Sequence, residues 1–406
     1  MSLLSLKSRI IIPTNWDMIP IGKALISSQY GTSQGNSKTG VPVVGMRNLQ
    51  NGKVVFNDLP FVVIDETEKE RLLLHDGDIL LNRTNSYDLV GKVGYVEKAI
   101  EAVFASYLVR LKVDKKKSDP RFVAVWLTSF WAEQMLKKIA TRAVSQVNLN
   151  PTEFKKFCLI PIPPLPEQKA IVDLLSAWDE AIEKIERLIQ AKEACFKRQA
   201  QRMISQRCDS WLHVKPKKIF DTISEKNFPD EELLSVTQDR GVIPRRMLEG
   251  RVMSPDGTIT SYKLIKRGDF VASLRSFQGG IEYSNYQGII SPAYTVLRPK
   301  IKLNNDFYRL FFKSYIFIEK YLPLAVIGIR DGKQISIPDF LDIKIPVPPL
   351  EEQKEIAETL SVFQHEIDLL KQLAEKYKTQ KRGLMQKVLT GQWRIRPEIV
   401  ERYKEA

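Results

Sequence analysis

Two long stretches of the chain place apolar residues at intervals of four and three in strict alternation. In residues 163–205 these positions are Ile171, Leu175, Trp178, Ile182, Ile185 and Ile189. In residues 348–390 they are Ile356, Leu360, Phe363, Ile367, Leu370, Ala374 and Tyr377. An apolar period of 3.5 residues with charged residues on the other faces is the seam of a coiled coil. The pattern therefore predicts two long helices.

The two stretches are copies of one another. A shift of 185 positions overlays them without a gap and matches Pro163, Pro164, Leu165, Glu167, Gln168, Lys169, Ile171, Leu175, Ser176, Ile182, Leu188 and Gln201 with the same residue types. Both copies follow a Pro-Pro pair, and acidic residues suit the positive start of a helix. Each helix of about 39 residues would be roughly 58 Å long. Unrelated helices that pack on separate domains would not keep a common register, so we expect an antiparallel pair that acts as a spacer.

Short β-type runs dominate the segment before the first helix. They cover residues 41–45, 53–56, 61–64, 78–81, 93–96 and 107–113, with turns at Asn51-Gly52 and Asp76-Gly77, and residues 122–139 have a helical pattern. The segment between the helices repeats these landmarks. Lys266-Arg267-Gly268-Asp269-Phe270 corresponds to His75-Asp76-Gly77-Asp78-Ile79, and residues 305–321 replace the helix.

These patterns predict an α+β protein with an internal pseudo-two-fold repeat. Two mixed α/β globular domains are separated by two long helices that form an antiparallel coiled coil. The expected boundaries are 1–162 for the first globular domain, 163–208 for the first helix, 209–347 for the second domain, and 348–406 for the second helix and its tail.

The net charge of +14 lies mainly on the globular segments. Residues 1–165 hold 22 Lys and Arg against 15 Asp and Glu, and residues 209–349 hold 21 against 16. A spread basic surface attracts phosphate backbones, although solvated lysines alone could give a modest excess. The three cysteines lack CxxC spacing and indicate free thiols in a reducing cytoplasm. No apolar run is long enough to span a membrane, and no signal peptide is evident.

Polar loops after apolar strands supply the candidate DNA contacts. Arg and Asn can make paired hydrogen bonds to guanine and adenine edges. In the first segment the candidates are Arg47, Asn48, Asn82, Arg83, Thr84, Asn85, Ser86, Gln146 and Asn148. In the second they are Arg240, Arg245, Arg246, Arg275, Ser276, Gln278, Arg330, Lys333 and Gln334. Each of these side chains could instead contact a phosphate, or be an ordinary solvent-exposed group.

The sequence lacks the marks of a reaction centre. The loop at Gly31, Gly35, Lys38 and Thr39 has the wrong spacing for a nucleotide-binding loop. The three histidines, His75, His213 and His365, show no metal-ligand spacing. Asp339 and Asp342 with Lys344 superficially resemble a nuclease pattern, but residues 154–157 of the first half offer no matching pair, so we expect a strand leading into the Pro-rich stop. The chain is expected to bind rather than catalyse.

The order of these parts resembles a known family. A variable segment, IPIPPLPEQKAI with a long helix, a second variable segment and IPVPPLEEQKEI with a long helix are similar to the specificity subunit of type I restriction–modification systems. YGTSQGNSKTGVPVVGMRNLQNGKV and LTGQWRI also resemble that family. The resemblance covers essentially the whole chain and is weakest at the start of the second variable segment.

The resemblance implies that the globular domains are target-recognition domains, each for one half of a gapped, asymmetric DNA sequence. It implies two modification subunits that bind S-adenosylmethionine and methylate adenine, and a restriction and translocation subunit that uses ATP and magnesium. None of these cofactors is expected on this chain. Two other classes remain open from the residues alone: a coiled-coil scaffold with protein-binding domains, and a nuclease or methyltransferase that acts by itself.

Overall fold

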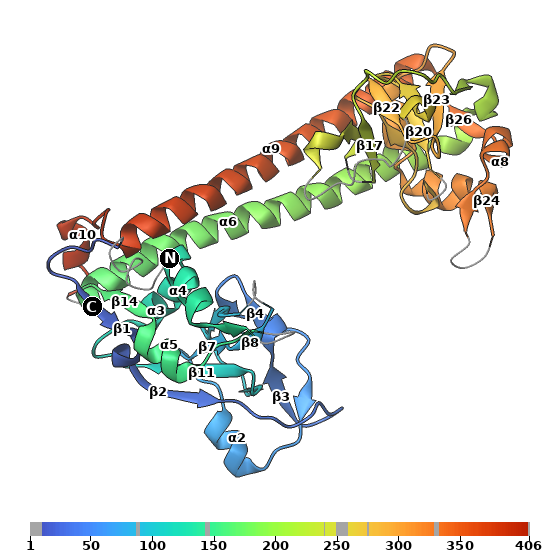
Figure 1. The fold of residues 1–406 in the computed structure, drawn as a ribbon. Helices are drawn as coiled ribbons and strands as arrows, with labels where there is room; N and C mark the ends of the chain where they lie inside the picture. The colour runs from blue at the N-terminus through green and yellow to red at the C-terminus, as the bar shows by residue number, and fades with distance from the viewer. Residues whose placement is uncertain are drawn as a thin grey trace. The chain divides into compact units, whose positions relative to one another are not determined.

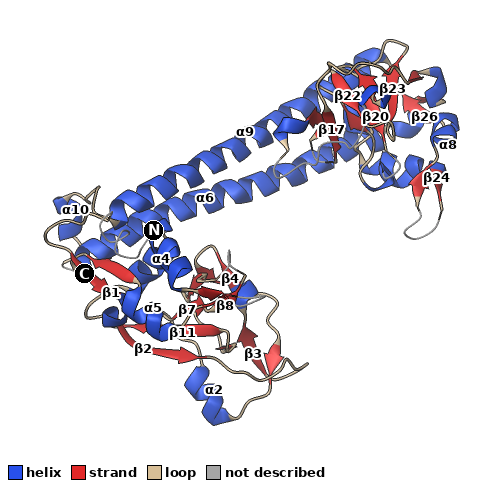
Figure 2. Ribbon diagram, in the orientation of Figure 1, coloured by secondary structure: helices blue, strands red, loops and turns tan. Residues whose placement is uncertain are grey.

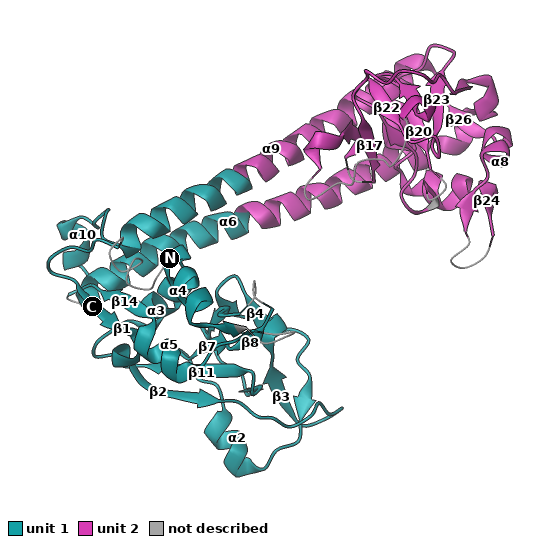
Figure 3. Cartoon of the chain, viewed as in Figure 1, with its two compact units in different colours: residues 1–184, 374–406 teal, residues 185–373 magenta. Residues whose placement is uncertain are grey.

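The computed structural model describes residues 10–86, 90–142, 147–238, 240–248, 259–273, 276–328 and 333–404. The chain divides into two compact units, one of residues 1–184 with 374–406 and the other of residues 185–373 (Figure 3). Helix α6 (Leu165–Ala200) and helix α9 (Leu350–Leu389) are each divided between the two units, α6 after residue 184 and α9 after residue 373. In the described part of the chain, no helix combines the length and the apolar character that crossing a bilayer requires.

The two long helices pair antiparallel in both units (Figure 1). In the first unit Lys381 forms an ion pair with Asp179, and the rings of Trp178 and Tyr377 are 5.4 Å apart. In the second unit Lys192 pairs with Glu366 at 2.7 Å. Higher residue numbers on α6 thus meet lower numbers on α9, which confirms the expected antiparallel coiled coil. The apolar positions that define the 3.5-residue period are all buried or half-buried.

The first unit is built on a six-stranded sheet of order β2-β11-β7-β9-β5-β4 (Figure 2). Its strands are β1 (Asp17–Pro20), β2 (Leu25–Tyr30), β3 (Val41–Val44), β4 (Leu49–Gln50), β5 (Lys53–Val54), β6 (Phe61–Val62), β7 (Ile79–Asn82), β8 (Thr84–Asn85), β9 (Val93–Tyr95), β10 (Val103–Phe104), β11 (Leu108–Val113), β12 (Thr141–Arg142), β13 (Val147–Asn148) and β14 (Leu159–Ile162). Its shorter helices are α2 (Glu66–Leu72), α3 (Pro120–Leu127), α4 (Phe130–Ile139), α5 (Pro151–Phe157) and α10 (Pro397–Glu401).

Alternation along the central strands separates two cores in the first unit. Ile79 and Leu81 of β7 face the larger core with helices α3, α4 and α5 and the start of α6. Leu80 of the same strand faces a smaller core with β3 and β10. The expected helix 122–139 is wrong in one respect, because it is two helices. The first ends at Leu127, and Ser129 caps the second by accepting a hydrogen bond from Ala132 N.

The second unit has a four-stranded sheet of order β16-β23-β20-β21. Its strands are β15 (Leu212–Val214), β16 (Phe220–Ile223), β17 (Leu234–Thr237), β18 (Gly241–Pro244), β19 (Lys263–Ile265), β20 (Phe270–Ala272), β21 (Glu282–Tyr283), β22 (Gly288–Ile290), β23 (Thr295–Pro299), β24 (Val326–Ile327), β25 (Gln334–Ile335) and β26 (Ile345–Val347). Its helices are α7 (Asn305–Phe311) and α8 (Ile337–Asp342). A phenylalanine-rich core joins α7 to Ile356 and Leu360 of α9. The expected helix 305–321 ends early, at Phe311, and a separate π-helical turn covers Phe317–Tyr321.

The repeat extends beyond the helices into the domains that they carry. Gln168 Nε2 donates to Pro163 O at 2.8 Å, and Gln353 Nε2 donates to Pro348 O at the same distance. The oxygen of each amide accepts from the residue that caps a helix of the domain preceding it in the chain, Asp119 N of α3 at 2.9 Å and Asn304 N of α7 at 2.8 Å. These capping residues are again 185 positions apart. One buried glutamine therefore ties each long helix to its own domain.

Candidate nucleic-acid interface

Three polar segments that lie far apart in the sequence come together in the first unit. Strand β8 pairs antiparallel with β13, so Thr84 lies opposite Asn148. Thr84 Oγ1 donates to Asn148 Oδ1 at 2.7 Å. Asn85 Nδ2 contacts Met46 Sδ at 3.4 Å, which brings the turn Met46–Asn48 alongside. The predicted loops 47–48, 82–86 and 146–148 thus form one surface, although Gln146 lies outside the described residues.

Arg83 lies between strands β7 and β8 on this surface. Its backbone is fixed, because Arg83 N donates to Tyr107 O at 3.1 Å and Arg83 O accepts from Leu149 N at 2.7 Å. Its guanidinium lies over the ring of Tyr30, 5.0 Å from the ring centroid. Nothing in the sequence pattern singled out Tyr30, which is 48% exposed. Arg47 and Ser86 are also exposed.

Asn48 and Asn82 are buried behind this surface. The Asn48 side chain accepts from Gly45 N at 3.0 Å and donates to Asn57 O at 2.9 Å. Asn82 is fully buried, and its oxygen accepts from Thr84 N at 3.3 Å. Their polar groups shape the turns that carry Arg47 and Arg83. Burial, which the local sequence does not reveal, gives both residues a supporting position rather than an exposed one.

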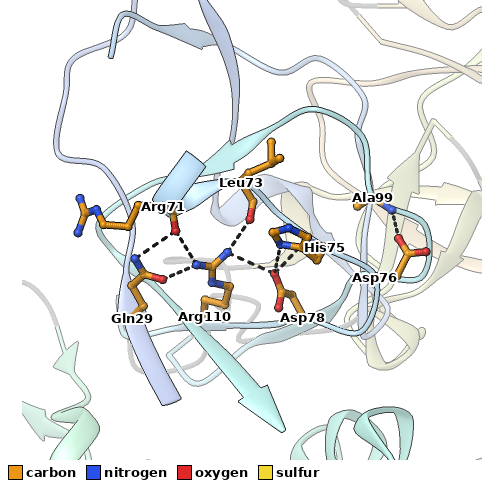
Figure 4. A network of polar contacts seen from close by, with 8 residues as sticks. All are labelled: Gln29, Arg71, Leu73, His75, Asp76, Asp78, Ala99 and Arg110. Atoms are coloured by element: carbon orange, nitrogen blue, oxygen red, sulfur yellow. Dashed lines mark hydrogen bonds and ion pairs between the residues drawn. The ribbon is translucent and has the colours of Figure 1, made fainter. Parts of the chain in front are cut away.

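A buried arginine braces the strands beneath the surface (Figure 4). Arg110 of β11 is 3% exposed and donates to Leu73 O at 2.6 Å, to Arg71 O at 2.8 Å and to Gln29 Oε1. It also pairs with Asp78 Oδ2 at 3.4 Å. Burial lowers the pKa of Arg110, and the Asp78 carboxylate opposes that effect. The network links β11 to the residue before β7 and to Gln29 of β2, which directly precedes Tyr30.

The second unit gathers its candidate residues differently. The 3₁₀ turn Ser276–Gln278 lies against β25, the strand that contains Gln334. Gln278, Lys333 and Gln334 are exposed, whereas Ser276 is buried and its oxygen accepts from Ser273 N at 2.9 Å. Arg275 and Arg330 lie outside the described residues.

A basic hairpin forms the other part of the second surface. Arg240 donates to Met247 O at 3.2 Å, and Arg246 donates to Glu232 Oε1 at 2.7 Å. Arg245 is half-buried, and its Nε and Nη1 atoms are buried without a recorded partner in the described chain. Below the hairpin, Arg298 of β23 makes two hydrogen bonds to Asp269, at 2.9 and 2.8 Å. An arginine–aspartate pair thus braces both sheets.

The acidic pair near the second Pro-rich stop lies on a helix, not on the expected strand. Asp339 and Asp342 belong to α8, and residues 154–157 belong to α5; only then do strands β26 and β14 follow. The prediction was wrong because Ser336 and Asn150 cap these helices, each accepting a backbone hydrogen bond. Lys215 and Lys217 bind Asp342 and lower its pKa to about 2. Among the described residues, no group of His, Cys, Asp and Glu side chains could hold a metal ion.

The starts of the long helices carry a second feature that the sequence did not reveal. Glu167 accepts from Trp16 Nε1 at 3.0 Å and from Arg394 Nε at 2.6 Å. Glu352 accepts from Trp211 Nε1 at 3.0 Å and from Arg207 Nη1 at 3.1 Å. In both cases the tryptophan precedes the strand that pairs with the domain's last strand. The signal available was the Glu-Gln pair shared by both repeats.

Comparison with known proteins identifies a family. The type I restriction modification DNA specificity domain matches residues 15–193 and 255–378. The putative type I restriction enzyme MjaX specificity subunit of Methanocaldococcus jannaschii is 27% identical over 95% of this chain and 95% of its own length. The MjaVIII specificity subunit of the same organism is 26% identical over 95% and 94%.

A solved structure has the same fold. The S subunit of a type I restriction–modification system from M. genitalium aligns over 92% of this chain and 96% of its own, with a TM-score of 0.55 and 17% identity. The family model covers both halves of the chain and well over half of its residues. The chain therefore belongs to the family of type I restriction–modification DNA specificity proteins.

Proposed function

We propose that this chain is the non-catalytic, sequence-specific DNA-binding subunit of a type I restriction–modification complex. Each globular domain recognises one half of a gapped, asymmetric sequence in double-stranded DNA. The observation that carries the proposal is the pair of equivalent helix starts, which present domains with different polar surfaces. Membership of the specificity family favours this function over a protein-binding scaffold.

Two kinds of contact divide the work in this proposal. Lysines and arginines of both domains bind phosphates, which sets the register on DNA and makes affinity fall with salt. Side chains of the loop surfaces then contact base edges, where a paired hydrogen bond is worth roughly 1–3 kcal/mol of discrimination. The candidates in the first domain are the exposed or half-exposed members of its surface, Arg47, Arg83, Thr84, Asn85, Ser86 and Asn148.

The proposed partners supply the chemistry. Two modification subunits dock beside the paired helices, bind S-adenosylmethionine and methylate adenine. Restriction and translocation subunits, which use ATP and magnesium, complete the endonuclease. This chain holds none of these cofactors, and the complex works in the cytoplasm. The specificity-subunit names of both relatives support this assignment.

The test is to produce the chain together with the modification subunit and to map methylated adenines in the host DNA. The expected result is a single motif with two fixed parts and a gap of constant length. Methylation without such a motif would contradict the proposal. Retention of protein ligands, with no preference among DNA sequences, would favour the scaffold.

The spacer role has its own test. Seven residues inserted at matched positions of α6 and α9 add about 10 Å of helix. Since base pairs are spaced by about 3.4 Å, the gap should grow by about three base pairs while both half-sequences stay the same. An unchanged gap would contradict the spacer role.

A further inference from the structure

Tyr30 and Arg83 meet at one edge of the central sheet of the first unit. The registers of β2, β11 and β7 place Tyr30, Val109 and Leu81 in one row across three strands. Tyr30 is the last residue of β2, and Arg83 directly follows the end of β7. Two residues that are 53 positions apart are therefore neighbours, because the strands that carry them end at the same edge.

The guanidinium of Arg83 has a defined orientation, and part of its hydrogen-bonding capacity has no recorded acceptor in the described residues. Its plane is held from one side by the Tyr30 ring, with 5.0 Å from Cζ to the ring centroid, and Nε makes a long contact of 3.5 Å with Ser106 O. Within the described residues, no acceptor is recorded for Nη1 or Nη2. Stacking on an aromatic face leaves the N–H groups in the guanidinium plane free to donate. Arg83 thus presents a fixed pair of donors.

The neighbouring polar side chains bond to one another, and none is recorded as an acceptor for the Nη1 and Nη2 groups of Arg83 in the described residues. Thr84 and Asn148 satisfy one another at 2.7 Å, and Asn85 contacts Met46. No carboxylate is recorded as a partner of Arg83 in the described chain. Arg246 of the second unit differs, because Glu232 engages its guanidinium at 2.7 Å.

We propose that Arg83 donates to O6 and N7 of a guanine in the half-site of the first domain, with Tyr30 as the positioning residue that fixes the guanidinium. The inference rests on the proposed function and adds the base that is recognised. The in-plane donor pair of arginine matches the two adjacent acceptors of guanine in the major groove, and no other base carries two acceptors there. A freely rotating arginine would bind phosphates as well as bases. The Tyr30 ring restricts the orientation of the guanidinium, so that its N–H groups point in one direction.

Among the described residues of the second domain, no aromatic residue stands at the position that corresponds to Tyr30. The corresponding edge strand β16 pairs with β23 and ends at Ile223, which Ser224 follows. Changes to Tyr30 should therefore alter one half-site and leave the other unchanged. This asymmetry provides an internal control within a single molecule of DNA.

The test compares Arg83→Ala and Tyr30→Leu with the conservative control Tyr30→Phe. Each full-length chain is produced with the modification subunit, and methylation is measured on a library in which one base of either half-site is varied. Arg83→Ala should lower discrimination for guanine at one position by roughly 5- to 150-fold, the range for one paired base contact. Tyr30→Leu should lower it at the same position, and Tyr30→Phe should retain it because the ring remains.

The outcomes separate the two proposals. A wild-type motif without a gap would overturn the proposed function. A gapped wild-type motif together with equal losses for all bases in Arg83→Ala would overturn the inference alone, since that pattern marks a phosphate contact. An unchanged profile in Tyr30→Leu would also overturn it. Thermal unfolding of Tyr30→Leu should match that of Tyr30→Phe, which excludes a loss of folding as the cause.

Discussion

The start of helix α6 and the start of helix α9 use the same side chains with different strength. At α6, Glu167 has a side chain that is 3% exposed, and Arg394 contacts both of its oxygens, at 2.6 and 2.9 Å. At α9, Glu352 is 25% exposed, and Arg207 contacts one oxygen at 3.1 Å. Both glutamates also accept from a tryptophan at 3.0 Å. The comparison teaches that the repeat preserves the attachment of a domain to its helix, while burial and geometry decide how strong that attachment is.

The largest expected effect concerns the two glutamates. Glu167→Ala removes the carboxylate that Arg394 contacts and leaves the buried Trp16 N–H without its acceptor, which should cost about 3 kcal/mol. Glu352→Ala should cost about 1 kcal/mol, because solvent can replace a single exposed contact. Thermal unfolding followed by circular dichroism measures both, and equal losses would show that burial does not set the difference.

The buried glutamines should give a smaller difference of the same sign. Gln168 has partners at Pro163, Lys117, Ser118 and Asp119, whereas Gln353 has partners at Pro348 and Asn304. We expect Gln168→Ala to cost about 2 kcal/mol and Gln353→Ala about 1 kcal/mol. Hydrogen exchange of the Asp119 and Asn304 amides should speed up in the respective variants. No change at either amide would refute the assigned bonds.

The smallest expected effect is specific to the first unit. Tyr403 donates to Asp173 Oδ2 at 2.8 Å, and this bond, with burial, raises the pKa of Tyr403. The equivalent position on α9, Glu358, is exposed. Tyr403→Phe should cost about 0.5 kcal/mol at neutral pH.

The pH dependence of that cost follows from the direction of the pKa shift. A tyrosine with a raised pKa stabilises the folded state fully below the unfolded value of about 10, and the stabilisation is lost as pH rises through the folded pKa. Wild type and Tyr403→Phe should therefore become equally stable above that range. A difference that persists at high pH would refute the role of the hydrogen bond.

Local patterns predicted the parts of this fold that depend on neighbouring residues. The 3.5-residue period defined both long helices, and the shift of 185 positions predicted their equivalence. The strand at residues 107–113 is β11, because its apolar alternation is strong. The 3.5-residue period and the strand alternation can be recognised in a single sequence because each pattern arises within one helix or strand.

The candidate interface depends on long-range pairing, which local patterns do not contain. Strands β8 and β13 have two residues each, too few to show alternation, yet their pairing joins Thr84 to Asn148. Tyr30 was missed because an aromatic residue at a strand end is equally compatible with a core position. Asn82 looked exposed because its neighbours are polar, although it is fully buried. The residue types of the loops thus indicated candidate segments, but not which of their side chains face outward.

The buried glutamine at each helix start relates the rotation of its domain about the helix axis to the length of the helix. Gln168 and Gln353 each bond both the entry of their own long helix and the capping residue of α3 or α7, and so couple the orientation of the domain to that of the helix. One residue added to either helix would turn the attached domain by about 100° about the helix axis, whereas seven would turn it by only about 20°. Changes in helix length that keep the orientation of the attached domain are therefore close to whole numbers of helical turns.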